Sequence, residues 1–123
     1  MRHRVKKIKF TDGIDANRAL VRKLAINFFL HGKLTTTLSK AKAIKPVIER
    51  LVEKMKVKTE ANVNYLKHTL DSKEVLMIAY RDISPVISKI NGGYVRIVKL
   101  GQRESDGAEV GRIEWVYPIV KQK

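Results

Sequence analysis

The residues with the clearest capacity for chemistry are three closely spaced lysines, Lys40, Lys42 and Lys45. Each ammonium group is a flexible point charge with three hydrogen-bond donors, so such a group suits the binding of anionic oxygens. The lysines open a segment with helical periodicity, where the helix dipole disfavours cations by roughly a few tenths of a kcal/mol. An anion outside the chain would offset this cost. The alternative interpretation is a solvated helix face, which is the usual role of surface charge.

A strand and a helix within residues 34–55 are expected to position these lysines. Residues 34–38 are β-branched and alternating in character, which predicts a half-buried strand. The apolar spacing then changes to three and four, which predicts an amphipathic helix with the lysines off its buried side. Pro46 should kink this helix or delay its regular part. The predicted buried side consists of Ala41, Ile44, Ile48, Leu51, Val52 and Met55.

The chain carries a large excess of positive charge. It has 26 lysine and arginine residues against 12 acidic residues, which gives a formal net charge of +14 in 123 residues. Residues 1–60 hold 16 basic and 5 acidic residues, whereas residues 61–123 hold 10 and 7. A single globular domain with this charge repels itself, so we expect it to function against a polyanion. The N-terminal half is the predicted electrostatic footprint.

The composition also bears on the compartment. The chain has no cysteine, which excludes disulfides and thiolate metal sites and fits a reducing environment. No apolar run approaches the roughly 20 residues of a membrane span. The basic N-terminus is not followed by an apolar segment of signal-peptide type. We therefore expect a soluble cytoplasmic protein with no membrane partner and no cleaved leader.

Residues 1–12 form a predicted basic arm ahead of a single domain over residues 13–120, and residues 121–123 form a frayed tail. The cations crowded into the arm cannot pack internally, so the arm is disordered alone or is ordered by a partner. We favour an arm that folds onto nucleic-acid phosphates, and the alternative is a solubilising tail. The candidate contacts in the arm are Arg2, His3, Arg4, Lys6, Lys7 and Lys9.

A helix is predicted over residues 16–31, with Asp15 as its N-terminal cap and Gly32 at its end. Its apolar face should pack in the core. Arg18 and Arg22 lie one turn apart on another side of the helix, so both remain available to phosphates.

Further helices are predicted over residues 60–70, capped by Thr59, and over residues 73–82, capped by residue 71 or 72. The second of these should stop at residues 83–85, where Pro85 disfavours helical geometry in the residue before it. The residues that follow are ambiguous, and one helical turn is an option.

A Gly-Gly pair at residues 92–93 precedes an alternating pattern that predicts a hairpin. Its strands cover residues 94–100 and 110–117, and a polar loop over residues 101–109 joins them. Arg96 should point away from the buried face. That buried face is predicted to hold Val95, Ile97, Ile113, Trp115 and Tyr117.

Sequence signatures of catalysis are missing from the chain. It has no Gly-rich phosphate loop, no histidine pair at metal spacing and no Gly-x-Ser-x-Gly elbow. His3, His31 and His68 are scattered over three elements, and the acids mostly fall at caps or on helix surfaces. We therefore predict that the chain is not an enzyme, with no catalytic residue, metal ion, cofactor or small-molecule substrate.

Several motifs occur in one order along nearly the whole chain. They are the opening Met-Arg-His-Arg, the helix start Asn17-Arg18-Ala19-Leu20, His31-Gly32-Lys33 followed by Thr36-Thr37-Leu38-Ser39-Lys40-Ala41-Lys42, Pro46, Gly92-Gly93-Tyr94-Val95-Arg96-Ile97, Lys99-Leu100-Gly101, residues 103–106, and Ile113-Glu114. Together they resemble the bacterial large-subunit ribosomal protein seventeen family. The agreement in order is a more specific signal than any single basic run.

The resemblance implies a compact α+β fold. The expected order is one helix, one strand, three helices and two strands. The three strands would join in one small mixed three-stranded sheet packed on the helices, and the basic N-terminal arm would extend from this domain.

The resemblance also implies a function. It indicates a structural constituent of the large ribosomal subunit that binds and stabilises large-subunit ribosomal RNA near the peptide exit region, in the cytoplasmic ribosome. Expected partners are this RNA and neighbouring large-subunit ribosomal proteins, without self-association. Phosphate neutralisation and RNA shape would provide recognition. Outside the arm, the RNA-contact candidates are Arg18, Arg22, Lys33, Lys40, Lys42, Lys45 and Arg96.

Two rival functions share some of these features. A DNA-binding protein would have similar charge, but the strand run at residues 34–38 is longer than the turn of a helix-turn-helix motif. A small ribonuclease is the enzymatic alternative, and it would depend on His31 or His68. We expect no cleavage of RNA.

Overall fold

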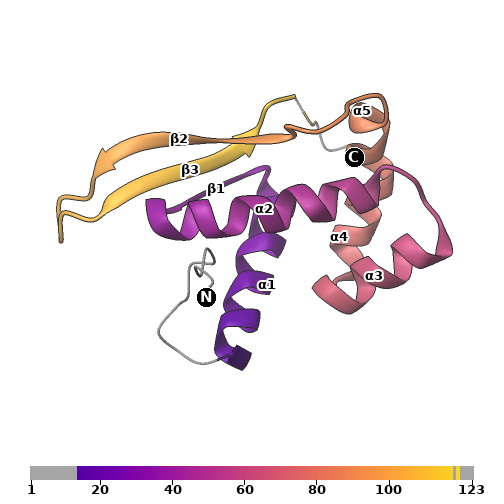
Figure 1. Ribbon diagram of the computed structural model, residues 1–123, viewed down its shortest axis with the longest axis horizontal. Helices are drawn as coiled ribbons and strands as arrows, with labels where there is room; N and C mark the ends of the chain where they lie inside the picture. The colour runs from indigo at the N-terminus through magenta and orange to yellow at the C-terminus, as the bar shows by residue number, and fades with distance from the viewer. Residues whose placement is uncertain (1–13, 118, 120–123) are drawn as a thin grey trace, which may run out of the picture.

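The structure is a computed structural model that describes residues 14–117 and residue 119 (Figure 1). The predicted arm at residues 1–12 and the tail at residues 121–123 lie outside the described residues. The elements are α1 (Ile14–His31), β1 (Lys33–Thr37), α2 (Leu38–Met55), α3 (Glu60–Leu70), α4 (Lys73–Ile78), the π-helical turn η1 (Ala79–Ile83), α5 (Ser84–Ile87), β2 (Val95–Gln102) and β3 (Glu109–Trp115). The α+β class and the predicted order of elements are confirmed, with η1 and α5 as additions.

The three strands form one sheet in the order β1-β3-β2, and both pairings are antiparallel. The expectation of a mixed sheet is therefore wrong. β1 and β2 do run in the same direction, but β3 lies between them, so no parallel pair forms. Lys33 and Arg96 both pair with Glu114, while Leu34 and Ile97 both pair with Ile113. Because side chains alternate along a strand, charged and apolar rows occupy opposite faces of the sheet.

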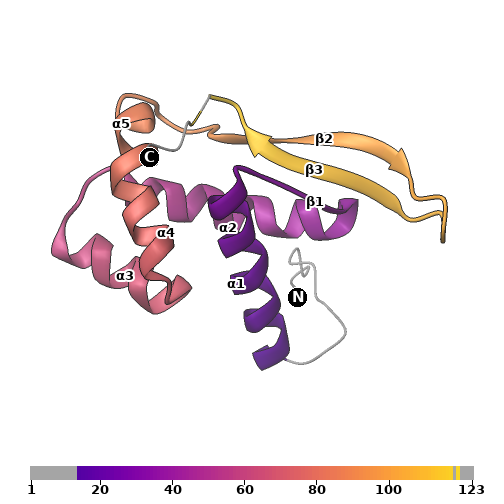
Figure 2. The same ribbon diagram turned by 180° about the vertical axis from the view of Figure 1, so that it is seen from behind.

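Helix α2 is the element against which the others pack. The sheet covers its N-terminal half, α1 crosses it, and α3, α4 and α5 gather toward its C-terminal end (Figures 1 and 2). All six residues of the predicted stripe are buried, from Ala41 to Met55. β3 approaches closely at Gly111, where an added Cβ would lie 3.0 Å from Leu38 Cδ1. The sheet and α2 therefore share one core.

The start of α2 is set by Thr37, whose hydroxyl accepts a hydrogen bond from the Lys40 backbone N–H at 3.4 Å. The helix continues across Pro46 to Met55, so the predicted delay of its regular part is wrong. Pro46 is exposed, and water can satisfy the carbonyl that loses its partner there. Buried residues before and after the proline hold both halves against the core.

Two carboxylates of α2 fix the chain that enters β2. Glu49 Oε2 accepts from the Tyr94 N–H at 3.1 Å, and Glu49 Oε1 accepts from the Val95 N–H at 3.2 Å. The buried Tyr94 hydroxyl donates to Glu53 Oε2. Burial, and then this bond to Glu53, raises the pKa of the Tyr94 hydroxyl well above its usual range. These contacts tie the sheet to α2 with hydrogen bonds as well as apolar packing.

Helix α1 begins at Ile14, so Asp15 lies inside the helix. The prediction of Asp15 as the cap before the helix is therefore wrong. The end of α1 is as predicted. Gly32 has a φ of 80° and its N–H donates to the Phe28 carbonyl at 2.7 Å. The α1 aromatics pack against the sheet through Trp115, whose ring centroid lies 5.0 Å from that of Phe28.

Helices α3 and α4 begin at the predicted caps, Thr59 and Ser72, whose hydroxyls accept from the Asn62 and Val75 N–H groups. The predicted stop at residues 83–85 is wrong, because the chain passes through η1 directly into α5. Pro85 falls in the first turn of α5, where its fixed φ is compatible with helical geometry. The optional helical turn after residue 83 is confirmed.

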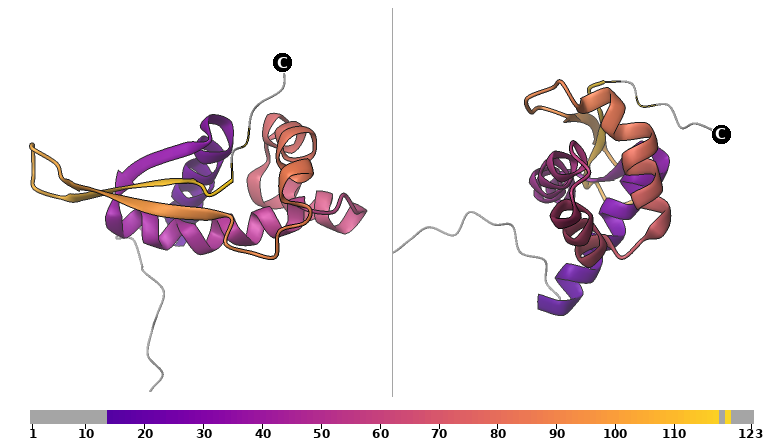
Figure 3. Two further views of the ribbon diagram at one scale, coloured as in Figure 1. Left: turned by 90° about the horizontal axis from the view of Figure 1, so that it is seen from above. Right: turned by 90° about the vertical axis from the view of Figure 1, so that its right-hand side faces the viewer.

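The hairpin strands extend further toward the loop than predicted, which shortens the loop to residues 103–108. At the other end of the hairpin, β2 begins one residue later and β3 ends two residues earlier than predicted. A bulge between Lys99 and Gly101 interrupts the β2–β3 register. The hairpin projects past the N-terminal end of α2, as the views in Figures 1 and 3 agree. Tyr117 lies beyond β3 and is exposed, so it does not join the predicted buried face.

Candidate nucleic-acid interface

Four cations of α2 form what we call the helix cluster: Lys40, Lys42, Lys45 and Arg50. Lys42 and Arg50 are exposed, and Lys40 and Lys45 are half-buried. The first turn of α2 contains no acidic residue. Within the described residues, none of the four cations has an ion pair. The helix cluster is therefore a run of uncompensated positive charge, and Lys40 lies in the first turn of α2, at the dipole end that favours anions.

Three cations surround one carboxylate on the open face of the sheet, and we call Lys33, Arg96, Arg112 and Glu114 the sheet cluster. Arg96 Nη2 and Nε donate to Glu114 Oε2 at 2.8 and 3.2 Å. Arg112 Nε donates to Glu114 Oε1 at 2.9 Å. Lys33 is exposed at the position of β1 that pairs with Glu114. The sheet cluster thus has two more positive than negative charges.

Glu114 orients the two arginines of this cluster. The bond from Arg96, and then that from Arg112, lowers the pKa of Glu114 below its usual value. The carboxylate therefore stays ionised at neutral pH and holds both planar guanidinium groups on the sheet. The Arg96 side chain is 58% exposed, which leaves the rest of its donors open to a phosphate.

The helix cluster and the sheet cluster lie on different sides of the molecule. The inner face of the sheet packs on Leu38 and Ala41 of α2, as the close contacts around Gly111 demonstrate. The sheet cluster points away from α2, whereas Lys42 and Arg50, the exposed members of the helix cluster, lie on α2 itself. The fold therefore brings Lys33 and Arg96 together but keeps them apart from the α2 lysines.

The two candidates on α1 differ in their surroundings. Arg18 is exposed. Arg22 Nε donates to the Thr69 carbonyl at 3.0 Å, in the last turn of α3. This bond satisfies a carbonyl that the helix leaves unpaired, so Arg22 links α1 to α3 while its remaining donors face solvent. The arm candidates, Arg2 to Lys9, lie outside the described residues.

Two basic residues of these clusters were missed by sequence reasoning. Arg112 follows from alternation along β3, since it is two residues from Glu114 and adjacent to the buried Ile113. Arg50 follows from helical spacing, since it is eight residues after Lys42 on the exposed side of α2. Both signals were present in the sequence.

The charge of the fold is strongly uneven. Residues 14–57, which cover α1, β1 and α2, hold ten basic and three acidic residues. Residues 58–90, which cover α3 to α5, hold five and four, and residues 91–117 of the hairpin region hold four and four. The attraction of the described fold for a polyanion therefore comes mainly from its N-terminal elements.

The ribonuclease alternative depends on His31 or His68. His31 and His68 are exposed, and they lie on different helices, α1 and α3. Across residues 14–117, no three His, Cys, Asp or Glu side chains gather in a way that could hold a metal ion. No helix of the described part of the chain is long and apolar enough to cross a membrane.

The sequence comparisons identify the family. The family model described as Ribosomal protein L17 matches residues 20–116. The chain belongs to this family. Its members are structural ribosomal proteins, which confirms the family resemblance and the prediction that the chain is not an enzyme. The matched residues include the helix cluster and the sheet cluster.

Curated relatives named "Large ribosomal subunit protein bL17" match most of the chain. The protein of Sulfurihydrogenibium sp. (strain YO3AOP1) is 40% identical over 96% of this chain and 99% of its own length. That of Thermomicrobium roseum is 37% identical over 94% and 99%. That of Cutibacterium acnes is 33% identical over 86% of this chain, which spans only 60% of that longer relative.

Proposed function

We propose that this chain is a structural constituent of the large ribosomal subunit that binds large-subunit ribosomal RNA through its two basic clusters and its N-terminal arm. The observation that carries the proposal is the uneven charge, with ten basic and three acidic residues over α1, β1 and α2. The chain belongs to a ribosomal protein family, so we infer that the polyanion it binds is ribosomal RNA. Neutralising its phosphates also releases counterions, which contributes to affinity.

The placement of the clusters suggests how binding would serve assembly. Because the helix cluster and the sheet cluster face different directions, one molecule would contact two RNA segments at once. Each segment would then pack against a cation-bearing surface rather than against the phosphates of the other. Recognition would rest mainly on RNA shape, since the exposed aromatics Tyr65 and Tyr117 come from separate elements and form no stacking platform.

The proposal extends to location and partners. We place the chain in the cytoplasmic ribosome, near the peptide exit region of the large subunit, beside neighbouring large-subunit proteins and without self-association. The first test is sedimentation of a cell lysate on sucrose gradients at moderate and high salt, with the chain followed by mass spectrometry. Cosedimentation with large subunits after the high-salt wash is the expected outcome.

A charge reversal tests the helix cluster itself. Lys40→Glu combined with Lys42→Glu should reduce incorporation into large subunits by about tenfold or more, because two phosphate contacts become repulsions. Circular dichroism of the isolated chain should be unchanged. The matched control is Lys73→Glu with Lys89→Glu, two exposed positions in the nearly neutral α3–α5 region. Equal incorporation of both double variants would remove the helix cluster from the interface.

The two rival functions are weakened by specific observations. β1 separates α1 from α2 and pairs with β3, so α1 and α2 are not arranged as a helix-turn-helix motif. A ribonuclease would lose activity with His31→Ala or His68→Ala. We expect the unmodified chain to leave structured RNA uncut in the same assay.

A further inference from the structure

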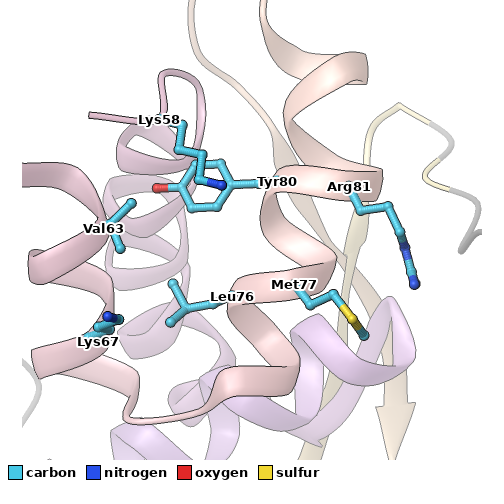
Figure 4. Close-up of a pocket in the computed structure, with 7 residues that line it drawn as sticks. All are labelled: Lys58, Val63, Lys67, Leu76, Met77, Tyr80 and Arg81. Carbon is cyan, nitrogen blue, oxygen red and sulfur yellow. The ribbon is translucent and has the colours of Figure 1, made fainter. Parts of the chain in front are cut away.

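A groove of about 470 Å³ lies along α4 beside α3, and none of its lining residues belongs to either basic cluster (Figure 4). Its walls are apolar. Val63 of α3, Leu76 and the ring of Tyr80 lie on one side of the groove, and Met77 lies on the other. Met77 is 53% exposed, which is unusual for a large apolar side chain. The apolar surface is left without cover by any other part of the described chain.

The rim of the groove is basic. Lys58, Lys67 and Arg81 line it, and no acidic side chain does. Lys58 and Lys67 have no ion pair in the described residues, whereas Arg81 donates to both carboxylate oxygens of Asp82. Lys58 Nζ lies 5.6 Å from the centroid of the Tyr80 ring. Two of the three rim cations are therefore available to an anionic group of a partner.

Tyr80, which lines the groove, carries a polar group of its own. Its hydroxyl is buried and has no hydrogen-bond partner among the described residues. Burial raises the pKa of this hydroxyl, so it remains a neutral donor. Buried polar atoms are nearly always paired in folded proteins, and an unpaired one typically costs about 1–3 kcal/mol. Tyr80 also belongs to η1, and π-helical turns often mark functional sites.

The surroundings of the groove favour a protein over a nucleic acid. Residues 58–90 have five basic and four acidic residues, so this region attracts RNA weakly. A nucleobase would need a free aromatic face for stacking, but Lys58 lies over the Tyr80 ring and the other walls are aliphatic. Methionine and aromatic side chains with a polar rim are typical of protein–protein contacts.

We propose that this groove receives a peptide segment from a neighbouring protein of the large subunit, with one apolar side chain between Leu76 and Met77 and an adjacent carboxylate between Lys58 and Lys67. The inference rests on the proposed function only for the compartment in which the partner is sought.

Site-specific photocrosslinking tests the occupant. The photoreactive residue p-benzoylphenylalanine replaces Met77 in the full chain in cells, and large subunits are purified after irradiation. We expect a protein adduct that survives ribonuclease, and its mapped peptide should carry Asp or Glu within a few residues of the cross-link. An RNA adduct, an adduct with a second copy of this chain, or no adduct would each overturn the proposal.

Charge reversal tests the basic rim in the same subunits. Lys58→Glu with Lys67→Glu should lower the yield of the adduct at position 77 at least fivefold. The control pair Lys73→Glu with Lys89→Glu lies in the same region of the chain, residues 58–90, but outside the groove, and it should leave the yield unchanged. A synthetic peptide with the mapped sequence should bind the full chain, and changing its acidic residue to the amide should weaken binding about fivefold. Equal adduct yields from the two double variants, or equal affinities of the acidic and amide peptides, would overturn the charge complementarity between the groove and its partner.

A second probe separates this inference from the proposed function. The same photoreactive residue at position 42, in the helix cluster, should give an RNA adduct that ribonuclease removes. If position 42 reaches RNA in large subunits but position 77 reaches no other protein, the groove proposal fails and the proposed function stands. If the chain is absent from large subunits, the proposed function fails and the groove proposal fails with it.

Discussion

Lys40 occupies the third position of α2, directly where Thr37 caps the helix. At this position the positive end of the helix dipole opposes the ammonium group. An acidic residue would suit the fold better there, and Thr37 with an acid three residues later would make the sequence of a capping box. A cation at this place is therefore best explained by an external anion.

The first prediction follows from this conflict between fold and function. Lys40→Glu should raise the free energy of unfolding of the isolated chain by about 0.3–1 kcal/mol, while it weakens RNA binding. Chemical denaturation and filter binding to large-subunit RNA measure the two effects. Lys40→Gln should fall between the parent and Lys40→Glu in both assays. A loss of stability, or unchanged affinity, would contradict this account of Lys40.

Glu114 predicts how stability depends on pH. Its pKa is lowered in the folded chain, first by Arg96 and then by Arg112. The stabilisation that ionised Glu114 gives the folded chain is thus fully present above its ordinary pKa of 4.5. It is lost as pH falls through the lower pKa of the folded chain.

In denaturation series from pH 7 to pH 3, Glu114→Gln should therefore be less stable than the parent at pH 7, and this difference should shrink toward pH 3. Glu109→Gln, on the same strand and without an ion pair in the described residues, serves as the control and should behave like the parent. A constant difference for Glu114→Gln at every pH would refute the role of the ion pairs.

At the scale of elements, the fold depends on how β2 is joined to α2. Glu49 uses both carboxylate oxygens to accept the N–H groups of Tyr94 and Val95, where the strand begins. The sequence predicts that most of the acids fall at caps or on helix surfaces. This role was not visible there, because the partners of Glu49 are distant in sequence and belong to the backbone.

Removing this link has a defined expected cost. Glu49→Ala leaves two partly buried N–H groups unpaired, so it should lower the free energy of unfolding by about 1–3 kcal/mol. Glu49→Gln retains one acceptor and should cost less. Arg50→Ala changes the next, exposed residue of α2 and should stay within about 0.5 kcal/mol of the parent. Urea denaturation ranks the three variants, and a Glu49→Ala effect no larger than that of Arg50→Ala would disprove the link.

At the scale of the whole molecule, the described fold has a basic part and a nearly neutral part. The basic part comprises α1, β1 and α2, and the sheet cluster adds arginines from the hairpin. The neutral part comprises α3 to α5 and carries the apolar groove. This division separates a surface suited to phosphates from one suited to a protein neighbour.

The salt dependence of RNA binding provides a test of this division. Changing Lys42 and Lys45 to Gln should reduce the slope of log affinity against log salt by roughly 1.4 to 1.8, because two phosphate contacts are lost. Changing Lys73 and Lys89 to Gln removes the same charge from the neutral part and should leave the slope nearly unchanged. Equal changes in slope would mean that only net charge matters.

The sequence by itself determined the features that depend on local pattern. The period of apolar residues predicted the buried stripe of α2, alternation predicted that Arg96 lies opposite Ile97, and glycine predicted the end of α1. Residue composition predicted the charge difference between the halves. Each of these follows from one segment and its own geometry.

Only the tertiary structure decided how distant segments meet. The pairing of β1 with β3 made the sheet antiparallel throughout, and it placed Lys33 opposite Glu114. Packing of Leu38 and Ala41 on β3 then placed α2 on the face of the sheet opposite the sheet cluster. Such choices arise from close packing between segments far apart in the chain, which local periodicity does not encode.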